Sequence, residues 1–150
     1  MLVRPLAAAD IPAWVALRAE LWPDQPHAEL DTEGRAAIAA EPPLVVFVAE
    51  TQGALAGFIE IGMRSVAEGC STSPVPYVEG WYVHADARRR GIGRALMAAV
   101  EAWCRERDYH ELGSDALADN RLSRDAHAAL GFEEVETLVV FRKALAHSTQ

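Results

Sequence analysis

The sequence has little cysteine and no pattern of metal ligands. Two cysteines, Cys70 and Cys104, occur among 150 residues. That is too few for a disulfide framework, and their presence does not imply that they pair. The five histidines are scattered along the chain, without the short spacings that zinc sites show. We therefore expect neither a disulfide framework nor a metal site.

Long apolar runs and a surplus of basic residues are also missing. No run approaches the roughly 18 apolar residues of a membrane span, and no charged leader precedes an apolar core at the N-terminus. The net charge is −8, because 22 Asp and Glu residues outnumber 14 Lys and Arg residues. Such a chain repels nucleic acid and attracts cations. We expect a cytoplasmic protein that binds neither membranes nor nucleic acid, with a small cationic molecule as its partner.

The chain has an ordinary globular composition and alternating strand and helix patterns. It is 51% hydrophobic and 24% charged, and 150 residues suit one domain. We predict a single domain over 1–145 and a disordered tail over 146–150. Apolar periodicity and turn residues predict the element order β-α-α-β-β-β-α-β-α-β-β. The predicted strands are 1–5, 44–50, 54–64, 75–83, 111–115, 132–135 and 137–143, and the predicted helices are 10–22, 27–40, 91–107 and 120–130.

The most informative stretch is a basic turn that contains glycine, between the 75–83 strand and the 91–107 helix. Residues 88–94 read Arg-Arg-Arg-Gly-Ile-Gly-Arg. At a helix N-terminus several N–H groups lack intrahelical partners, and the helix dipole adds partial positive charge. Such a turn suits a phosphate or pyrophosphate, and the arginines add full charge. It is neither a Walker loop nor a dinucleotide fingerprint. A basic surface turn before an ordinary helix is the alternative.

The spacing Arg-x-x-Gly-x-Gly, filled by Arg88, Gly91 and Gly93, resembles the acyl-CoA pyrophosphate loop of the GNAT superfamily of N-acetyltransferases. The resemblance implies the GNAT fold, an α/β (α+β) architecture in which a mixed central sheet of about seven strands is flanked by about four helices. It implies acetyl-CoA as co-substrate and a homodimer, the state common among relatives. The residues implied to contact acetyl-CoA are Trp81, Tyr82, Val83, Arg88, Arg89, Arg90, Gly91, Ile92, Gly93, Arg94 and Asn120.

Further motifs resemble the aminoglycoside 6′-N-acetyltransferases within that superfamily. They are Leu-Trp-Pro at 21–23, Gly-Cys-x-x-Ser-Pro at 69–74, Val-Glu-Gly-x-x-Val at 78–83, Ser-Asp at 114–115 and His-Ala-Ala-Leu-Gly-Phe at 127–132. This resemblance covers about residues 1–145. It implies acetylation of the 6′-amino group of aminoglycoside antibiotics. The residues implied to line the acceptor pocket are Trp22, Gln25, Glu79, Asp115 and Glu136.

Acetylation of an amine requires an ammonium to lose a proton and a leaving thiolate to gain one. A carboxylate can hold the cation and take the proton directly or through water. Asp115 is the first candidate and Glu79 the second, although both could be solvated acids at strand ends. His127 stands where many superfamily members place a tyrosine general acid, and a structural helix histidine is an equal alternative. Cys70 is interpreted as a packing residue.

Two other functions stay open. The chain could acetylate another small amine, a polyamine or a peptide N-terminus, which acceptor screening would reveal. It could also be a non-catalytic module that binds acetyl-CoA or a cationic drug, in which case saturable binding would occur without thiol release.

Overall fold

The computed structural model describes residues 1–147. These residues belong to two compact units, Met1–Asp115 and a second that begins at Ala116, and each is described by itself. The last three residues of the predicted tail lie outside the described residues.

The first unit is built on a four-stranded antiparallel sheet with the order β1-β2-β3-β4. The strands are β1 (Leu2–Pro5), β2 (Val45–Thr51), β3 (Ala54–Arg64) and β4 (Val75–Val83). Gln52 and Gly53 both have positive φ, at 51° and 78°, and close a two-residue hairpin turn between β2 and β3. The three strands β2, β3 and β4 form an antiparallel meander.

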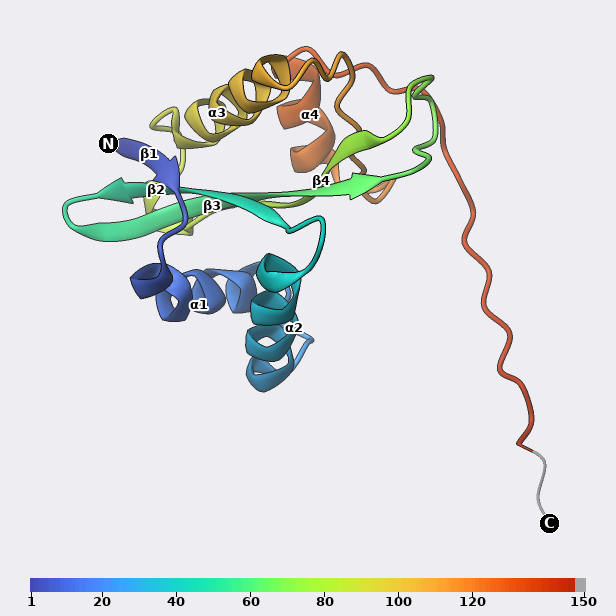
Figure 1. Ribbon diagram of the computed structural model, residues 1–150, viewed down its shortest axis with the longest axis horizontal. Helices are drawn as coiled ribbons and strands as arrows, with labels where there is room; N and C mark the ends of the chain where they lie inside the picture. Colours follow the sequence, from blue (N-terminus) through green and yellow to red (C-terminus); the bar gives the residue numbers. More distant parts are fainter. Residues whose placement is uncertain (148–150) are drawn as a thin grey trace. The chain divides into compact units, whose positions relative to one another are not determined.

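Helices cover both faces of this sheet. Figure 1 shows α1 (Ile11–Leu21) and α2 (His27–Ala39) on one face and α3 (Ile92–Glu106) on the other. Side chains of β3 alternate between the faces, as a pleated strand requires. Phe58 therefore packs with Trp14 and Leu30 of α1 and α2, whereas a side chain at Gly57 would meet Leu96 of α3. The second unit contains α4 (Arg121–Ala129).

The prediction of about seven strands is wrong for the described residues. Segment 111–115 forms a single parallel bridge, between Gly113 and Tyr77 of β4. The segments 132–135 and 137–143 have no regular secondary structure. Their apolar pattern is typical of strands, but a strand needs a partner edge to satisfy its backbone groups. The side chains of Val140 and Phe141 are instead 83% and 88% exposed.

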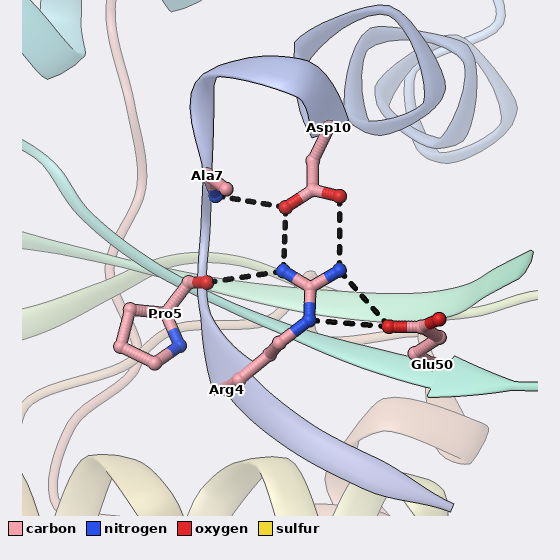
Figure 2. Close-up of polar contacts among 5 residues, drawn as sticks. All are labelled: Arg4, Pro5, Ala7, Asp10 and Glu50. Atoms are coloured by element: carbon pink, nitrogen blue, oxygen red, sulfur yellow. Dashed lines mark hydrogen bonds and ion pairs between the residues drawn. The ribbon is translucent and has the colours of Figure 1, made fainter. Parts of the chain in front are cut away.

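Arg4 fixes where the first helix begins (Figure 2). Its guanidinium donates two hydrogen bonds to Asp10, at 2.6 and 3.0 Å, and two to Glu50 of β2, at 3.2 and 3.0 Å. Asp10 also accepts the N–H of Ala7, so it closes the turn before α1, and its side chain does not cap that helix. The Arg4 hydrogen bonds lower the pKa of Asp10.

Neither a membrane-spanning helix nor a metal-binding cluster occurs in the part of the chain that the structure describes. Among residues 1–147, no helix is long and apolar enough to cross a membrane. The same residues contain no cluster of three or more histidine, cysteine or acidic side chains that could hold a metal ion.

Candidate acetyl-transfer site

A β-bulge in β4 shapes the acceptor side of the candidate site. Glu60 of β3 pairs with Gly80, but the next residue, Ile61, pairs with Val78, so Glu79 has no residue opposite it. An extra residue of this kind bends the strand and redirects a side chain, and bulges are frequent next to active sites. The bulge places Glu79 beside Gly62, where a side chain would come within 3.0 Å of its carboxylate.

Both candidate acceptor carboxylates have partners within the first unit. Arg64 donates to the two oxygens of Glu79 from Nε at 3.0 Å and from Nη2 at 2.9 Å. The hydroxyl of Tyr77 donates to Oδ2 of Asp115 at 2.7 Å. Burial and then this hydrogen bond raise the pKa of Tyr77, so its hydroxyl keeps its proton. Asp115 thus accepts a hydrogen bond from a hydroxyl that stays protonated, and Glu79 pairs with an arginine that stays charged.

Trp22, which is predicted to line the acceptor pocket and is called its aromatic wall below, lies at the C-terminal end of α1. Its ring reaches β4, because a Cβ added to Gly80 would lie 2.9 Å from it. An open pocket of about 450 Å³ follows the α1–α2 connection and is lined by Trp22, Gln25 and Glu29. Gln25 donates a 2.7 Å hydrogen bond to Glu33. The arrangement brings an aromatic face and acidic groups together, which suits a cationic sugar.

A buried ion pair supports that wall. Glu60 is 1% exposed; its Oε1 lies 2.8 Å from Nε of Arg18 and accepts the indole N–H of Trp14 at 3.1 Å. The Arg18 guanidinium lies 5.1 Å from the centre of the Trp22 ring, a cation–π distance. Burial raises the pKa of Glu60 to about 7, although Arg18 and Trp14 act to lower it.

The predicted pyrophosphate loop follows β4 in the same unit. Gly91 adopts the left-handed conformation, at φ +78°, immediately before α3, where a residue with a Cβ would be strained. A Cβ added to Gly91 would have no atom within 4 Å, so space alone does not require glycine here. Arg89, Arg90 and Arg94 are exposed, whereas Ile92 is 3% exposed. The start of α3 thus offers backbone N–H groups and the exposed guanidiniums of three arginines, and the buried Ile92 anchors it in the core.

Other predicted acetyl-CoA residues are engaged with their own strand or loop. Nε of Arg88 donates to the carbonyl oxygen of Val83 at 3.0 Å, so this arginine holds the loop to the end of β4. The hydroxyl of Tyr82 donates to Glu20 at 3.0 Å. The same carboxylate lies 2.9 Å from Nδ1 of His84, and this contact raises the pKa of His84. Trp81 packs along Gly93 at the start of α3.

Asn120, His127 and Glu136 belong to the second unit, and their contacts are described within that unit. Asn120 caps α4 by accepting the N–H of Ser123 at 3.1 Å. Nδ1 of His127 lies 2.7 Å from the carbonyl oxygen of Ser123 and must therefore carry the proton of that hydrogen bond. Its ring meets Phe132 edge-on, with 5.0 Å between the centroids. These contacts give Asn120 and His127 structural roles in α4. The predicted role of Asn120 in acetyl-CoA binding and that of His127 as a general acid stay predictions.

The sequence reading missed four residues that the structure connects to the candidate site: Arg18, Glu60, Arg64 and Tyr77. The importance of Glu60 could have been predicted from the sequence, because a lone acid inside the apolar strand 54–64 must find a buried partner. The contacts of Arg64 and Tyr77 could not have been predicted from the sequence, because they depend on the pairing of β3 with β4. Cys70, by contrast, agrees with its interpretation as a packing residue, since burial raises the pKa of its thiol and disfavours the thiolate.

Comparison with known proteins defines the class. The Acetyltransferase (GNAT) family matches residues 14–132, and the chain belongs to this family. It is 41% identical to the aminoglycoside N(6′)-acetyltransferase type 1 of Klebsiella aerogenes, over 96% of this chain and 97% of that protein. It is 40% identical to the enzyme of the same name from Stenotrophomonas maltophilia, over 95% of this chain and 93% of that protein.

Solved structures agree with this class. The structure of AAC(6′)-Iy in complex with the bisubstrate analog CoA-S-monomethyl-acetylneamine has a TM-score of 0.88 and 33% identity, covering 96% of this chain and 98% of that one. The aminoglycoside 6′-N-acetyltransferase AAC(6′)-Ih from Acinetobacter baumannii has a TM-score of 0.86 and 34% identity, covering 97% and 99%.

The buried Glu60 predicts a pH-dependent stability. Its pKa in the folded protein, about 7, lies above the ordinary value of 4.5, so the folded state holds the extra proton between these values. The free energy of unfolding should then fall as the pH rises through this window, by about 3 kcal/mol at 1.36 kcal/mol per pKa unit. Glu60→Gln, which cannot ionise, should lack this slope in urea unfolding between pH 4.5 and 7.5.

The exposed Glu33→Gln variant is the matched control and should follow the wild-type curve. Parallel curves for the wild type and Glu60→Gln would contradict the raised pKa of Glu60.

Proposed function

We propose that this protein transfers the acetyl group of acetyl-CoA to the 6′-amino group of aminoglycoside antibiotics, and so confers resistance to them. The observation that supports this most directly is the placement of two kinds of charge along one strand. The acceptor carboxylate Glu79 lies on the bulge of β4, and the basic loop 88–94 follows the end of the same strand. Relatives that carry this name match nearly the whole chain.

Direct transfer requires a group that accepts a proton from the acceptor, and the first unit contains two candidates for it. The ammonium nitrogen of the acceptor binds near a carboxylate and loses a proton to it, directly or through water. The free amine then attacks the thioester carbonyl carbon and the new C–N bond forms. The C–S bond breaks and the thiolate leaves with its electron pair; the nitrogen gives up its second proton, and the thiolate takes up one proton, so that an amide and a thiol result. Asp115 is our first candidate for the base, because Tyr77 holds its carboxylate in place. Glu79 is the second candidate.

We assign the binding of acetyl-CoA to backbone N–H groups and to side chains of the basic loop. The N–H groups at Trp81–Val83, at the end of β4, are the candidates for holding the carbonyl oxygen as it gains negative charge. Arg89, Arg90 and Arg94 are exposed around the start of α3 and suit a pyrophosphate, together with the N–H groups that follow Gly91. Asn120, His127 and Glu136 keep their proposed roles in acetyl-CoA binding, thiolate protonation and acceptor binding.

We also propose that residues 1–145 act as one acetyltransferase domain in the cytoplasm, where acetyl-CoA is available. The family match supports the single domain, since it runs from 14 to 132 across the boundary between the two units. Acetylation of another amine and non-catalytic binding share the same loop. No contact in the described residues favours either over the aminoglycoside.

Acceptor choice is the first test. Purified protein should release thiol from acetyl-CoA with aminoglycosides that carry a 6′-amino group and not with matched 6′-hydroxyl members. Thiol release should be followed with both kinds at equal concentration, with polyamines and a peptide amine alongside. Activity with both kinds would place the acetyl group elsewhere on the sugar, and activity with polyamines or peptides alone would contradict the aminoglycoside assignment.

Asp115→Asn tests the proposed base. The amide oxygen can still accept the Tyr77 hydroxyl, so the fold should persist, but the proton acceptor is lost. We expect kcat to fall by about 10²- to 10⁴-fold, with little change in the dissociation constant for acetyl-CoA. Asp31→Asn, an equal charge change on the exposed side of α2, should keep wild-type kinetics. A matching loss of acetyl-CoA binding in Asp115→Asn would remove Asp115 from the acceptor side.

We propose a homodimer in which the C-terminal segment contributes to the interface. Val139, Val140 and Phe141 are 73%, 83% and 88% exposed, and exposed apolar side chains of an extended segment favour pairing with another chain. The wild type should have twice the chain mass of 16.3 kDa by light scattering. Phe141→Asp should shift it towards the monomer and Thr137→Asp should not; a monomeric wild type would overturn this proposal.

A further inference from the structure

The carboxylate of Glu79 is already occupied by a cation of its own chain. Arg64 is the last residue of β3, and it reaches across to the bulge residue of β4. Its Nε and Nη2 contact the two carboxylate oxygens separately, at 3.0 and 2.9 Å. This forked geometry is the strongest way in which a side chain can hold a carboxylate. It leaves few positions on Glu79 for the ammonium groups of an acceptor.

Arg64 also lies between the two candidate acceptor carboxylates. Its guanidinium carbon lies 3.5 Å from the centre of the Tyr77 ring, and the Tyr77 hydroxyl donates to Asp115. One continuous series of contacts therefore runs from Glu79 through Arg64 and Tyr77 to Asp115. A cation that replaces Arg64 on Glu79 would enter the same series and would come near Asp115.

The pair is open to replacement. The side chains of Arg64 and Glu79 are 38% and 32% exposed, so solvent and solutes can reach both. Even in a forked pair, side chains with this exposure stay in contact with water, which screens their attraction, and a solute cation can compete for the same oxygens. By contrast, Glu60 and Arg18 are 2% and 9% exposed in their pair, and no solute can replace either. Of these two ion pairs beside β4, only Arg64–Glu79 can exchange its cation.

We propose that Arg64 is an internal cation that occupies Glu79 in the free protein and competes with the ammonium groups of the acceptor, so that it sets the affinity and selectivity for polycationic acceptors. This inference rests on the proposed function, because it assumes that the acceptor carries several positive charges. An acceptor with several ammonium groups displaces Arg64 from Glu79, and the guanidinium then turns towards solvent or stays on the Tyr77 ring. An acceptor with one ammonium group displaces it less readily.

Kinetics of Arg64→Gln test this competition. Removing the internal cation should lower KM for a 6′-amino aminoglycoside by about two- to fivefold, the range that measured exposed ion pairs span. The change should lie in the acceptor KM, and the KM for acetyl-CoA should be unaltered. Arg35→Gln is the matched control, because Arg35 makes an exposed pair with Asp31 of α2 and its loss changes the net charge equally. Its acceptor KM should equal that of the wild type.

Two further variants separate competition from other effects of Arg64. In a Glu79→Gln background, Arg64→Gln should no longer lower KM, since the carboxylate for which the two cations compete is gone. Arg64→Lys keeps the charge without the fork and should lie between the wild type and Arg64→Gln. A KM that rises or stays unchanged in Arg64→Gln, with an unaltered melting temperature, would overturn the proposal and would make Arg64 a positioning residue or a bystander.

A failure of the proposed function can be told apart from a failure of this inference. If the wild type acetylates no aminoglycoside, calorimetric binding of the same aminoglycoside to the wild type, Arg64→Gln and Arg35→Gln replaces KM. Tighter binding to Arg64→Gln alone would support the competition, although the acetyl-transfer assignment had failed. Equal binding to all three proteins, or no binding to any, would overturn the competition itself.

Discussion

The carboxylate of Glu60 is the group around which the first unit is organised. It lies in the middle of β3 and is 1% exposed, and its partners come from α1: Arg18 at 2.8 Å and the indole of Trp14 at 3.1 Å. Arg18 also donates a 2.7 Å hydrogen bond to the carbonyl oxygen of Leu30 in α2. A buried charge that loses its partner costs about 3–5 kcal/mol, so β3, α1 and α2 must meet at this point.

Two glycines allow the elements around the Glu60–Arg18 pair to approach one another closely, and one of them lies on β4 at the candidate site. Gly34 of α2 allows the close approach, because a Cβ there would lie 2.6 Å from the Arg18 guanidinium. Gly80 of β4 does the same on the other side, since a Cβ there would come within 3.2 Å of Glu60 and 2.9 Å of the Trp22 ring. The bulge that follows from the Glu60–Gly80 pairing then presents Glu79. The ring of Trp22 and the candidate acceptor carboxylate of Glu79 are thus both positioned next to the buried Arg18–Glu60 pair.

Local patterns in the sequence predicted much of the fold and the motif-bearing loop. The bounds of 54–64 and 75–83 agree with β3 and β4, because apolar runs ended by turn residues are local signals. The Arg64 fork on Glu79 was not predictable, since it depends on a register shift between two strands. The strands expected at 132–135 and 137–143 failed for a related reason: sequence pattern indicates which segments can pair, but not whether a partner edge is present. The hydrogen bond from Arg88 to the carbonyl oxygen of Val83 was not predictable from the motif either, and the predicted contact of Arg88 with acetyl-CoA stays a prediction.

Opposite charges must coexist in this site without cancelling each other. A pyrophosphate needs a cationic surface and a polyamine sugar needs an anionic one, and the candidate residues for both lie on β4 or directly after it. Glu79 and Val83 are four residues apart, which is about 13 Å along a strand, and the basic loop begins beyond Val83. This separation exceeds the screening length of about 8 Å at physiological ionic strength, so each surface keeps its own field. Among the described residues of the first unit, Arg64 is the cation that pairs with Glu79, so it is better placed than the exposed arginines of the loop to affect what Glu79 binds.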